Sequence, residues 1–195
     1  MVNIGVLALQ GSIVEHIHSL SLIEGINPCE VKSVSDLEKI SGLILPGGES
    51  TTMGKLIKDF GLNEPIIKRA KEGMPIWGTC AGMILMAKEI VNENYVHLGL
   101  MDISVRRNAY GSQLDSFNST ASIPVISHED IPLVFIRAPW VETAGEKVRI
   151  LTRVNNRIAA VQQDNMIATS FHPELTTNLV FHKYFTGIVK KYLKT

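Results

Sequence analysis

Three segments of the chain repeat one pattern: a short apolar run, a turn that contains glycine, and then residues with helical spacing. They are NIGVLAL with the QGS that follows it, GLILPGGEST, and PIWGTCAGMILMAKEI. Nearly continuous apolar runs are typical of strands buried on both faces, and such strands alternate with helices in parallel sheets. The pattern therefore predicts an α/β fold on a mostly parallel sheet, in which the third segment forms a helix ending near Glu89.

The second half of the chain has a different pattern. From about Met101 it contains short alternating runs, among them DISVRRN, PLVFIRAP, VRILTRV, RIAAVQQ and MIATSF. Such runs, separated by turn residues, are typical of antiparallel strands. Residues from about Thr176 to Leu193 have helical spacing. We therefore predict a flavodoxin-like three-layer sandwich: a mixed, mostly parallel central sheet, helices on both faces, and a single domain over residues 1–195.

Charge and composition exclude several classes of partner. Nineteen basic and nineteen acidic residues give a formal net charge of zero, so nothing attracts the whole chain to nucleic acid or to an anionic membrane. The apolar runs are too short to span a bilayer, and MVNIGVLALQGS lacks the basic region and cleavage site of a signal peptide. We therefore expect a cytoplasmic protein in which Cys29 and Cys80 are both thiols.

Cys80 lies in GTCAG, residues 78–82, which has the form of a nucleophile elbow. In such an elbow a strained turn between a strand and a helix lifts the nucleophile above the carboxyl edge of the sheet. The helix N-terminus favours a thiolate there, and the backbone N–H of Ala81 could donate to an oxyanion. The alternative is that Cys80 is a small buried apolar residue at a tight turn. Cys29, in INPCEV, is interpreted as a packing residue.

A base for such a nucleophile is present in ATSFHPEL, where His172 is followed two residues later by Glu174. Proline after His172 favours extended backbone, in which residues two apart project from the same side. Glu174 could then orient His172, and His172 could deprotonate Cys80, as in a catalytic triad. Taken alone, the segment could also be an ordinary surface turn.

The glycine pair Gly47 and Gly48 in LPGGEST follows another predicted buried strand. Without side chains in the way, their backbone N–H groups could reach a negative oxygen beside the nucleophile. Gly48 would then be a second oxyanion donor. The alternative is a plain turn with Ser50 or Thr51 as the helix N-cap, and both interpretations can hold together.

These segments together resemble the triad-type, class I glutamine amidotransferase family. Within it, the chain is similar to the glutaminase subunits of pyridoxal phosphate synthases. The similarity extends over almost the whole chain, in the order GVLALQGSIVEHI, LILPGGESTTM, GTCAGMILMAKEI, GLMDISVRRNAYGSQ, FIRAP and ATSFHPELT. It implies hydrolysis of L-glutamine to glutamate and ammonia through a glutamyl thioester, without a metal or an organic cofactor.

The resemblance also implies roles for individual residues. Cys80 matches the nucleophile, and His172 with Glu174 matches the pair that relays charge. The residues that match the glutamine-binding and oxyanion positions are Gly47, Gly48, Glu49, Ser50, Ala81, Arg107, Ile136 and Arg137. An arginine suits the glutamine carboxylate, and Glu49 could meet its ammonium. The family pattern leads us to expect GRQ where this chain has GSQ, so Ser112 is a departure near the site or a partner.

The implied partner is a synthase subunit of TIM-barrel type in a large hetero-oligomer, which uses the ammonia to make pyridoxal phosphate. Alternatives are the glutaminase of histidine biosynthesis, a non-catalytic glutamine-binding regulatory subunit, and a cysteine hydrolase or peptidase on a related sheet. The other histidines have no metal-ligand spacing and are interpreted as surface or packing residues: His16, His18, His97, His128 and His182.

Overall fold

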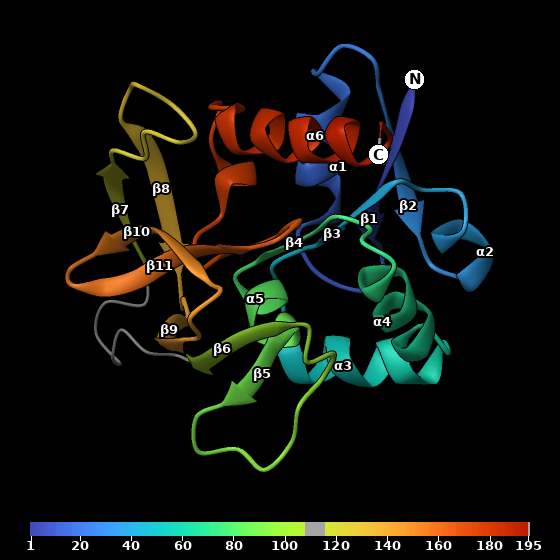
Figure 1. Ribbon diagram of the computed structural model, residues 1–195, viewed down its shortest axis with the longest axis horizontal. Coiled ribbons are helices and arrows are strands. Elements are labelled where there is room, and N and C mark those ends of the chain that lie inside the picture. The colour runs from blue at the N-terminus through green and yellow to red at the C-terminus, as the bar shows by residue number, and fades with distance from the viewer. Residues whose placement is uncertain (108–115, 195) are drawn as a thin grey trace.

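The computed structural model describes residues 1–107 and 116–194. Its main sheet has ten strands, nine of them in the order β2-β1-β3-β4-β12-β11-β9-β6-β5, with β10 paired to β11 (Figure 1). From β2 to β12 the neighbouring strands are parallel; β11 and β9 introduce antiparallel pairs, and β5 and β6 are parallel to each other. The strands are β1 (Val2–Leu7), β2 (Ile26–Val31), β3 (Gly42–Leu45), β4 (Ile76–Thr79), β5 (Ala87–Ile90), β6 (Met101–Arg106), β9 (Trp140–Ala144), β10 (Arg149–Val154), β11 (Arg157–Gln163) and β12 (Met166–Thr169).

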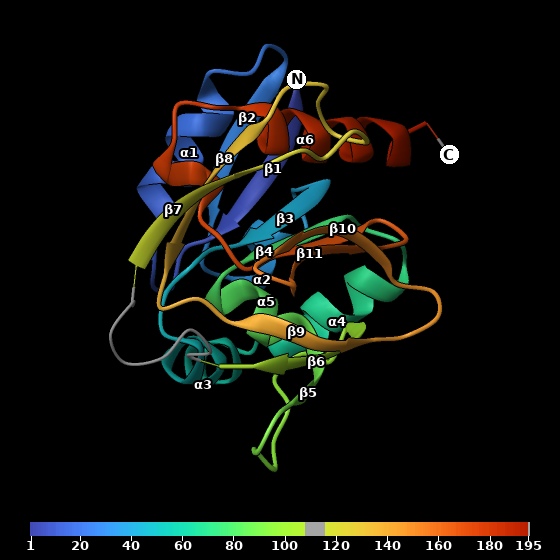
Figure 2. The same ribbon diagram turned by 90° about the vertical axis from the view of Figure 1, so that its left-hand side faces the viewer.

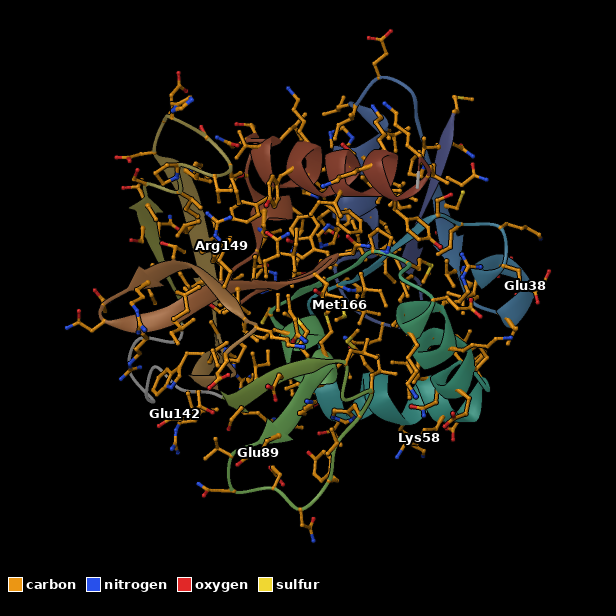
Figure 3. The ribbon with its side chains drawn as sticks, viewed as in Figure 1. Glu38, Lys58, Glu89, Glu142, Arg149 and Met166 are labelled. Atoms are coloured by element: carbon orange, nitrogen blue, oxygen red, sulfur yellow. The ribbon has the colours of Figure 1, made fainter. Side chains whose placement is uncertain are left out.

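Helices cover both faces of this sheet, as predicted (Figures 1 and 2). On one face lie α1 (Ile13–Ser21), α6 (Val180–Tyr192) and the separate hairpin of β7 (Ser116–Ala121) with β8 (Ile131–Ile136); on the other lie α2 (Val34–Leu37), α3 (Ser50–Asp59), α4 (Asn63–Lys71) and α5 (Ala81–Met86). Side chains fill both interfaces, while Glu38 and Lys58 project at the periphery (Figure 3). In the described part of the chain, no helix has the length and apolar character needed to cross a membrane.

Each face of the sheet has its own apolar core. Leu43, Leu45 and Ile76 are among the residues that pack beneath α2 to α5, whereas Ile44 and Trp77 pack beneath α1 and α6. Successive side chains of a strand point to opposite faces, so strands covered on both sides must be apolar at every position. The fold class predicted from the continuous apolar runs is thus confirmed.

The helix that follows Cys80 is shorter than predicted. It ends at Met86, and Ala87–Ile90 forms β5 instead of continuing toward Glu89. The carbonyl oxygens of Leu85 and Met86, which a longer helix would use, accept the backbone N–H groups of Leu98 and Leu100. These tertiary bonds satisfy the carbonyl groups at the helix end, so the chain leaves the helix early.

The last helix also begins later than predicted. Residues Pro173–Leu175 form a 3-10 turn, and α6 starts at Val180, whose N–H is accepted by the side chain of Asn178 at 2.9 Å. This asparagine satisfies one of the N–H groups that a helix start leaves unpaired.

Candidate active site

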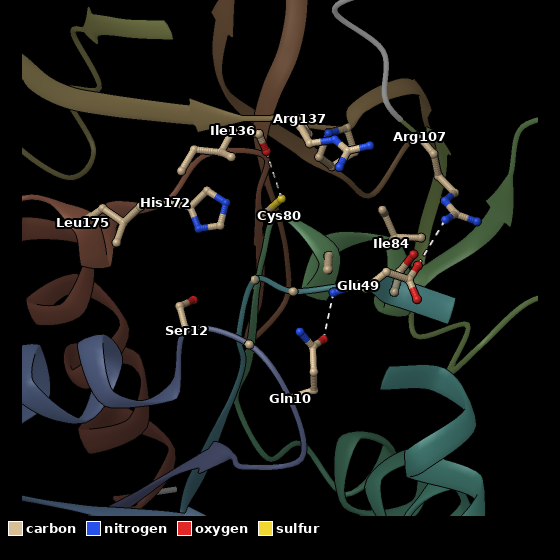
Figure 4. A pocket seen from close by; sticks show the side chains of 16 residues that line it. Gln10, Ser12, Glu49, Cys80, Ile84, Arg107, Ile136, Arg137, His172 and Leu175 are labelled. Carbon is tan, nitrogen blue, oxygen red and sulfur yellow. Dashed lines mark hydrogen bonds and ion pairs between the residues drawn. The ribbon is translucent and has the colours of Figure 1, made fainter. Parts of the chain in front are cut away.

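A pocket opens at the carboxyl edge of the parallel strands, where β1, β3 and β4 end and the chain leaves β12 (Figure 4). Its volume is about 630 Å³, within the range of small-molecule sites. The lining contains every candidate site residue except Glu174, which lies behind His172. Residues outside the predicted set also line the pocket: Gln10, Gly11, Ser12, Ile84, Pro139 and Leu175.

Cys80 occupies the turn between β4 and α5 with a φ of 49° and a ψ of −104°. Such a backbone conformation is strained for any residue other than glycine, and strain of this kind gathers at functional sites. The N–H of Cys80 donates to the Thr169 carbonyl at 2.8 Å, which ties the turn to β12. A side chain at Gly78 would meet the backbone of Gly82, and one at Gly82 would meet the Leu45 carbonyl. The two glycines therefore allow the close packing on which the elbow depends.

His172 and Glu174 form a close pair beside this cysteine. Nδ1 of His172 and Oε1 of Glu174 are 2.7 Å apart, and both residues are buried. Because Nδ1 is engaged by the carboxylate, Nε2 is the ring nitrogen left for Cys80, whose side chain faces the imidazole in Figure 4. The proline after His172 predicted an extended backbone here. Glu174 instead lies in the 3-10 turn, and the turn brings its carboxylate back to the ring.

The charge state of His172 depends on its two neighbours. Burial by itself lowers the pKa of this imidazole, but hydrogen bonds to Cys80 and Glu174 and the negative charges of both raise the pKa to about 10. His172 therefore carries a proton at neutral pH when Cys80 is a thiolate. A thiolate beside such an imidazolium is the reactive form of a cysteine nucleophile.

Glu174 is held by groups from α1 and from the turn before it. Ser12 Oγ donates to Oε1 at 2.6 Å, and His16 Nε2 lies 3.5 Å from Oε2. Burial alone raises the pKa of the Glu174 carboxyl, but His16, His172 and Ser12 together lower it to about 2. The carboxylate is therefore ionised at neutral pH.

The glycine loop is fixed by the turn after β1. The Gly47 carbonyl accepts the backbone N–H of Ser12 at 3.0 Å, and Gln10 Oε1 accepts the N–H of Glu49 at 2.8 Å. In a planar trans peptide the C=O and the N–H point in opposite directions, so the Gly48 N–H points away from Ser12. Gln10 and Ser12 were not among the predicted site residues; their position directly after the first buried strand, at the same sheet edge, was the available signal.

Glu49 and Arg107 lie next to each other at the rim of the pocket. The Glu49 carboxylate caps α3 by accepting the N–H groups of Thr51 and Thr52. The N-cap is therefore Glu49, and the prediction of Ser50 or Thr51 was wrong. Burial opposes ionisation of Glu49, but these two threonines lower its pKa to about 2. Nη2 of Arg107 is 3.4 Å from Oε1 of Glu49. The two side chains offer a paired anion and cation to a ligand.

Ile136 and Arg137 form the opposite wall. The carbonyl of Ile136 lies 3.8 Å from Cys80 Sγ, within reach of the thiol proton. Arg137 has a φ of 45°. Among the described residues, the non-glycine positions with positive φ are Cys80 and Arg137, which both line the pocket, and a set of turn asparagines and an aspartate, namely Asn92, Asn155, Asn156 and Asp164.

Ser112 and its neighbours in GSQ lie outside the described residues. Among the residues that are described, no group of three or more His, Cys, Asp or Glu side chains is arranged to hold a metal ion. Of the histidines interpreted as surface or packing residues, His16 and His182 are fully buried, and His16 reaches Glu174.

A cysteine at a strained elbow, with a buried His–Glu pair at the same edge of an α/β sheet, is the arrangement of cysteine-dependent acyl-transfer enzymes. The model of the SNO glutamine amidotransferase family matches residues 6–191. The chain belongs to this family.

Named relatives and a solved structure agree with this assignment. Pyridoxal 5'-phosphate synthase subunit PdxT of Thermoanaerobacter sp. (strain X514) is 58% identical over 94% of this chain and 97% of its own length. The PdxT subunit of Clostridium botulinum (strain Loch Maree / Type A3) is 50% identical over 100% and 99%. The crystal structure of a glutamine amidotransferase superposes with a TM-score of 0.90 at 41% identity, covering 96% of this chain and 98% of that one.

Proposed function

We propose that this chain is the glutaminase subunit of a pyridoxal 5'-phosphate synthase and that it hydrolyses L-glutamine to glutamate and ammonia. The observation that carries the proposal is that Cys80 and His172 line one pocket, with Glu174 bound to His172 from behind, in a chain that belongs to a glutamine amidotransferase family. The relatives named as subunits of that synthase align over almost their entire length. The names of these relatives favour this synthase over the glutaminase of histidine biosynthesis.

Glutamine binds with its side-chain amide at Cys80 and its amino-acid end toward the rim. Arg107 and Arg137 both line the pocket, and a guanidinium suits a carboxylate because it can donate two parallel N–H groups. Glu49 is a fixed anion beside Arg107, and it can accept from the ammonium of the substrate.

In the first half-reaction, Cys80 Sγ attacks the amide carbon. The carbonyl oxygen gains the electron pair and accepts the backbone N–H groups of Ala81 and Gly48. When the tetrahedral intermediate collapses, the C–N bond breaks, the imidazolium of His172 protonates the leaving nitrogen, and ammonia departs. A glutamyl thioester and a neutral His172 remain, and Glu174 keeps the ring in place throughout.

In the second half-reaction, water attacks the thioester carbon. His172, now neutral, takes a proton from that water. The same two N–H groups hold the second oxyanion, the C–S bond breaks, and glutamate leaves. Cys80 returns as a thiolate opposite a protonated His172, so the cycle balances with glutamine and water as the only reactants.

The remaining parts of the proposal concern the surroundings of the enzyme. The acceptor of the ammonia is a synthase subunit of TIM-barrel type in a large hetero-oligomer. The glutaminase is docked on it, because ammonia released into water is protonated and diluted. A cytoplasmic location belongs to the same proposal, since a reducing compartment keeps the Cys80 thiol available.

The test is glutamate release from glutamine by the purified chain, alone and with the synthase subunit, in wild type and in Cys80→Ala. Cys29→Ala is the matched control, because Cys29 lies on β2, away from the pocket. Turnover that rises with the synthase, is lost in Cys80→Ala and persists in Cys29→Ala supports the proposal. Absence of turnover in both states, with glutamine still bound, would instead identify a regulatory glutamine-binding subunit.

A further inference from the structure

The two oxygens of the Glu174 carboxylate have unequal surroundings. Oε1 accepts from Ser12 and from His172, at 2.6 and 2.7 Å. Oε2 is buried and accepts no hydrogen bond from the described residues. Nε2 of His16 lies 3.5 Å from it. A buried anionic oxygen without a donor is costly, so the proton that His16 carries on this side matters for the triad.

His16 lies on the buried side of α1, behind the triad. Its ring is fully buried against Trp77 and His182. Nδ1 of His16 is 3.0 Å from Nε2 of His182, and Nε2 of His16 is 3.2 Å from Thr79 Oγ1. Nδ1 of His182 is buried without a partner in the described structure.

These contacts select one protonation pattern. If His16 carried its proton on Nδ1, it would donate to His182 Nε2, and a neutral His182 would need its proton on Nδ1. That proton would be a buried donor without an acceptor, and the lone pair of His16 Nε2 would face the Glu174 carboxylate. Both arrangements are unfavourable. With both rings protonated on Nε2, His182 donates to His16, and His16 directs its N–H toward Thr79 and Glu174.

We propose that His16 is a positioning residue of the triad: as the neutral Nε2–H tautomer, set by His182, it holds Oε2 of Glu174 and keeps the carboxylate turned toward His172. The inference rests on the glutaminase activity proposed above and assigns His16 no contact with substrate. A connected network of side chains then runs from the pocket into the core between β4, α1 and α6. In order, its members are Cys80, His172, Glu174, His16 and His182.

The neutral state of His16 is important for this role. Burial lowers its pKa, and the charges that act on the ring are those of Glu174, His172 and Glu15, of which only His172 acts in the same direction as burial. A neutral N–H orients the carboxylate without cancelling its charge. The negative charge of Glu174 therefore remains available to the imidazolium of His172.

The direct test is a tautomer measurement on the wild-type chain. Long-range ¹H–¹⁵N correlation spectra of histidine-labelled protein distinguish Nδ1–H, Nε2–H and charged rings, and His16→Gln assigns the His16 signals by their loss. The expected result is a neutral Nε2–H ring for both His16 and His182 at neutral pH. An Nδ1–H or charged His16 overturns the proposal. This readout does not depend on turnover, so it stays interpretable even if the chain proves not to be a glutaminase.

The kinetic test compares two substitutions of nearly equal shape. His16→Met removes the donor, whereas His16→Gln keeps an N–H near the position of Nε2. We expect His16→Met to lower kcat about tenfold, the effect of one hydrogen bond to a charged group, with little change in KM, and His16→Gln to restore most of it. His18→Met is the matched control, since His18 lies on the exposed side of the same helix.

A pH profile separates positioning from a general loss of folding. A looser Glu174 stabilises the imidazolium of His172 less, so the alkaline limb of the kcat profile moves to lower pH in His16→Met. Rates are normalised to the fraction of folded protein at each pH, which removes the contribution of unfolded protein. An unshifted profile, or a His16→Gln variant as slow as His16→Met, overturns the proposal. If His16→Met does not fold, the tautomer measurement on the wild type decides.

Discussion

The Cα of Gly47 lies directly against the imidazole ring of His172. A side chain built on Gly47 would meet Cε1, Nδ1 and Nε2 of that ring. The two residues come from loops after β3 and β12, and β4 with its elbow lies between these strands in the sheet. The glycine therefore has two roles: its loop lines the pocket, and its missing side chain leaves space for the His172 ring.

Gly47→Ala is expected to displace the His172 ring and to lower kcat/KM at least about 100-fold, because a shift of about 1 Å in a catalytic group costs this much. Gly187→Ala is the control: a methyl group at this helical position meets nothing within 4 Å. It should leave turnover unchanged and raise the free energy of unfolding by about 0.5–1 kcal/mol. Steady-state kinetics measures the turnover of the two variants, and denaturant unfolding measures their stability. A fully active Gly47→Ala would contradict the packing described here.

Glu174→Gln removes the charge that supports the imidazolium of His172. The pKa of His172, raised to about 10 in the native site, should fall, because the amide cannot stabilise the protonated ring. The interaction that raises the pKa stabilises the protonated ring at low pH, and this stabilisation is lost as the pH rises through the pKa. In Glu174→Gln, His172 should therefore lose its proton at a lower pH than in the wild type. NMR titration of His172 measures this directly. An unchanged titration would mean that Cys80 alone sets the charge of the ring.

The consecutive arginines 106 and 107 provide a paired test of substrate binding. Arg107 lines the pocket, whereas Nε of Arg106 pairs with Glu142 at 3.0 Å, away from it. Arg107→Met is expected to raise KM for glutamine about tenfold, the equivalent of one hydrogen bond between charged groups, with a smaller effect on kcat. Arg106→Met should leave both constants near wild type. Equal effects of the two substitutions would argue against a role for Arg107 in binding glutamine.

His182 should make the fold sensitive to acid. Burial lowers its pKa to about 3, against about 6.5 in an unfolded chain. Between these values the unfolded chain binds the additional proton, so stability falls as the pH falls. In His182→Gln, the slope of unfolding free energy against pH between 4.5 and 6.5 should drop by up to about 1.4 kcal/mol per pH unit. Denaturant unfolding across that window tests this, and His18→Gln controls for the loss of a histidine.

Local signals in the sequence predict much of this structure. The glycine spacing around Cys80 predicts the elbow, and the continuous apolar runs predict the parallel strands, because both depend on residues close together in the chain. The pairing of His172 with Glu174 was also expected, although a 3-10 turn and not an extended segment produces it.

Other features depend on contacts that no local pattern encodes. The early end of α5 is caused by hydrogen bonds from Leu98 and Leu100. The role inferred for His16 depends on His182, which lies 166 positions away, and on Glu174. A buried polar histidine on an apolar helix face looks like any packing residue until its partners are known. The sequence therefore predicts which residues carry the chemistry better than it predicts which residues support them.

The parallel pairing of β4 with β12 places Thr79 opposite Thr169, and the Cys80 N–H bonds to the carbonyl of Thr169. The hydrogen-bonded pairing of these two strands thus fixes the spacing between Cys80 and His172, although 92 positions separate these residues in the chain. Strands β5 to β11 lie between Cys80 and His172 in the sequence and take no part in the pairing of β4 with β12. A change in the length or shape of this intervening stretch should therefore leave the spacing between Cys80 and His172 unchanged.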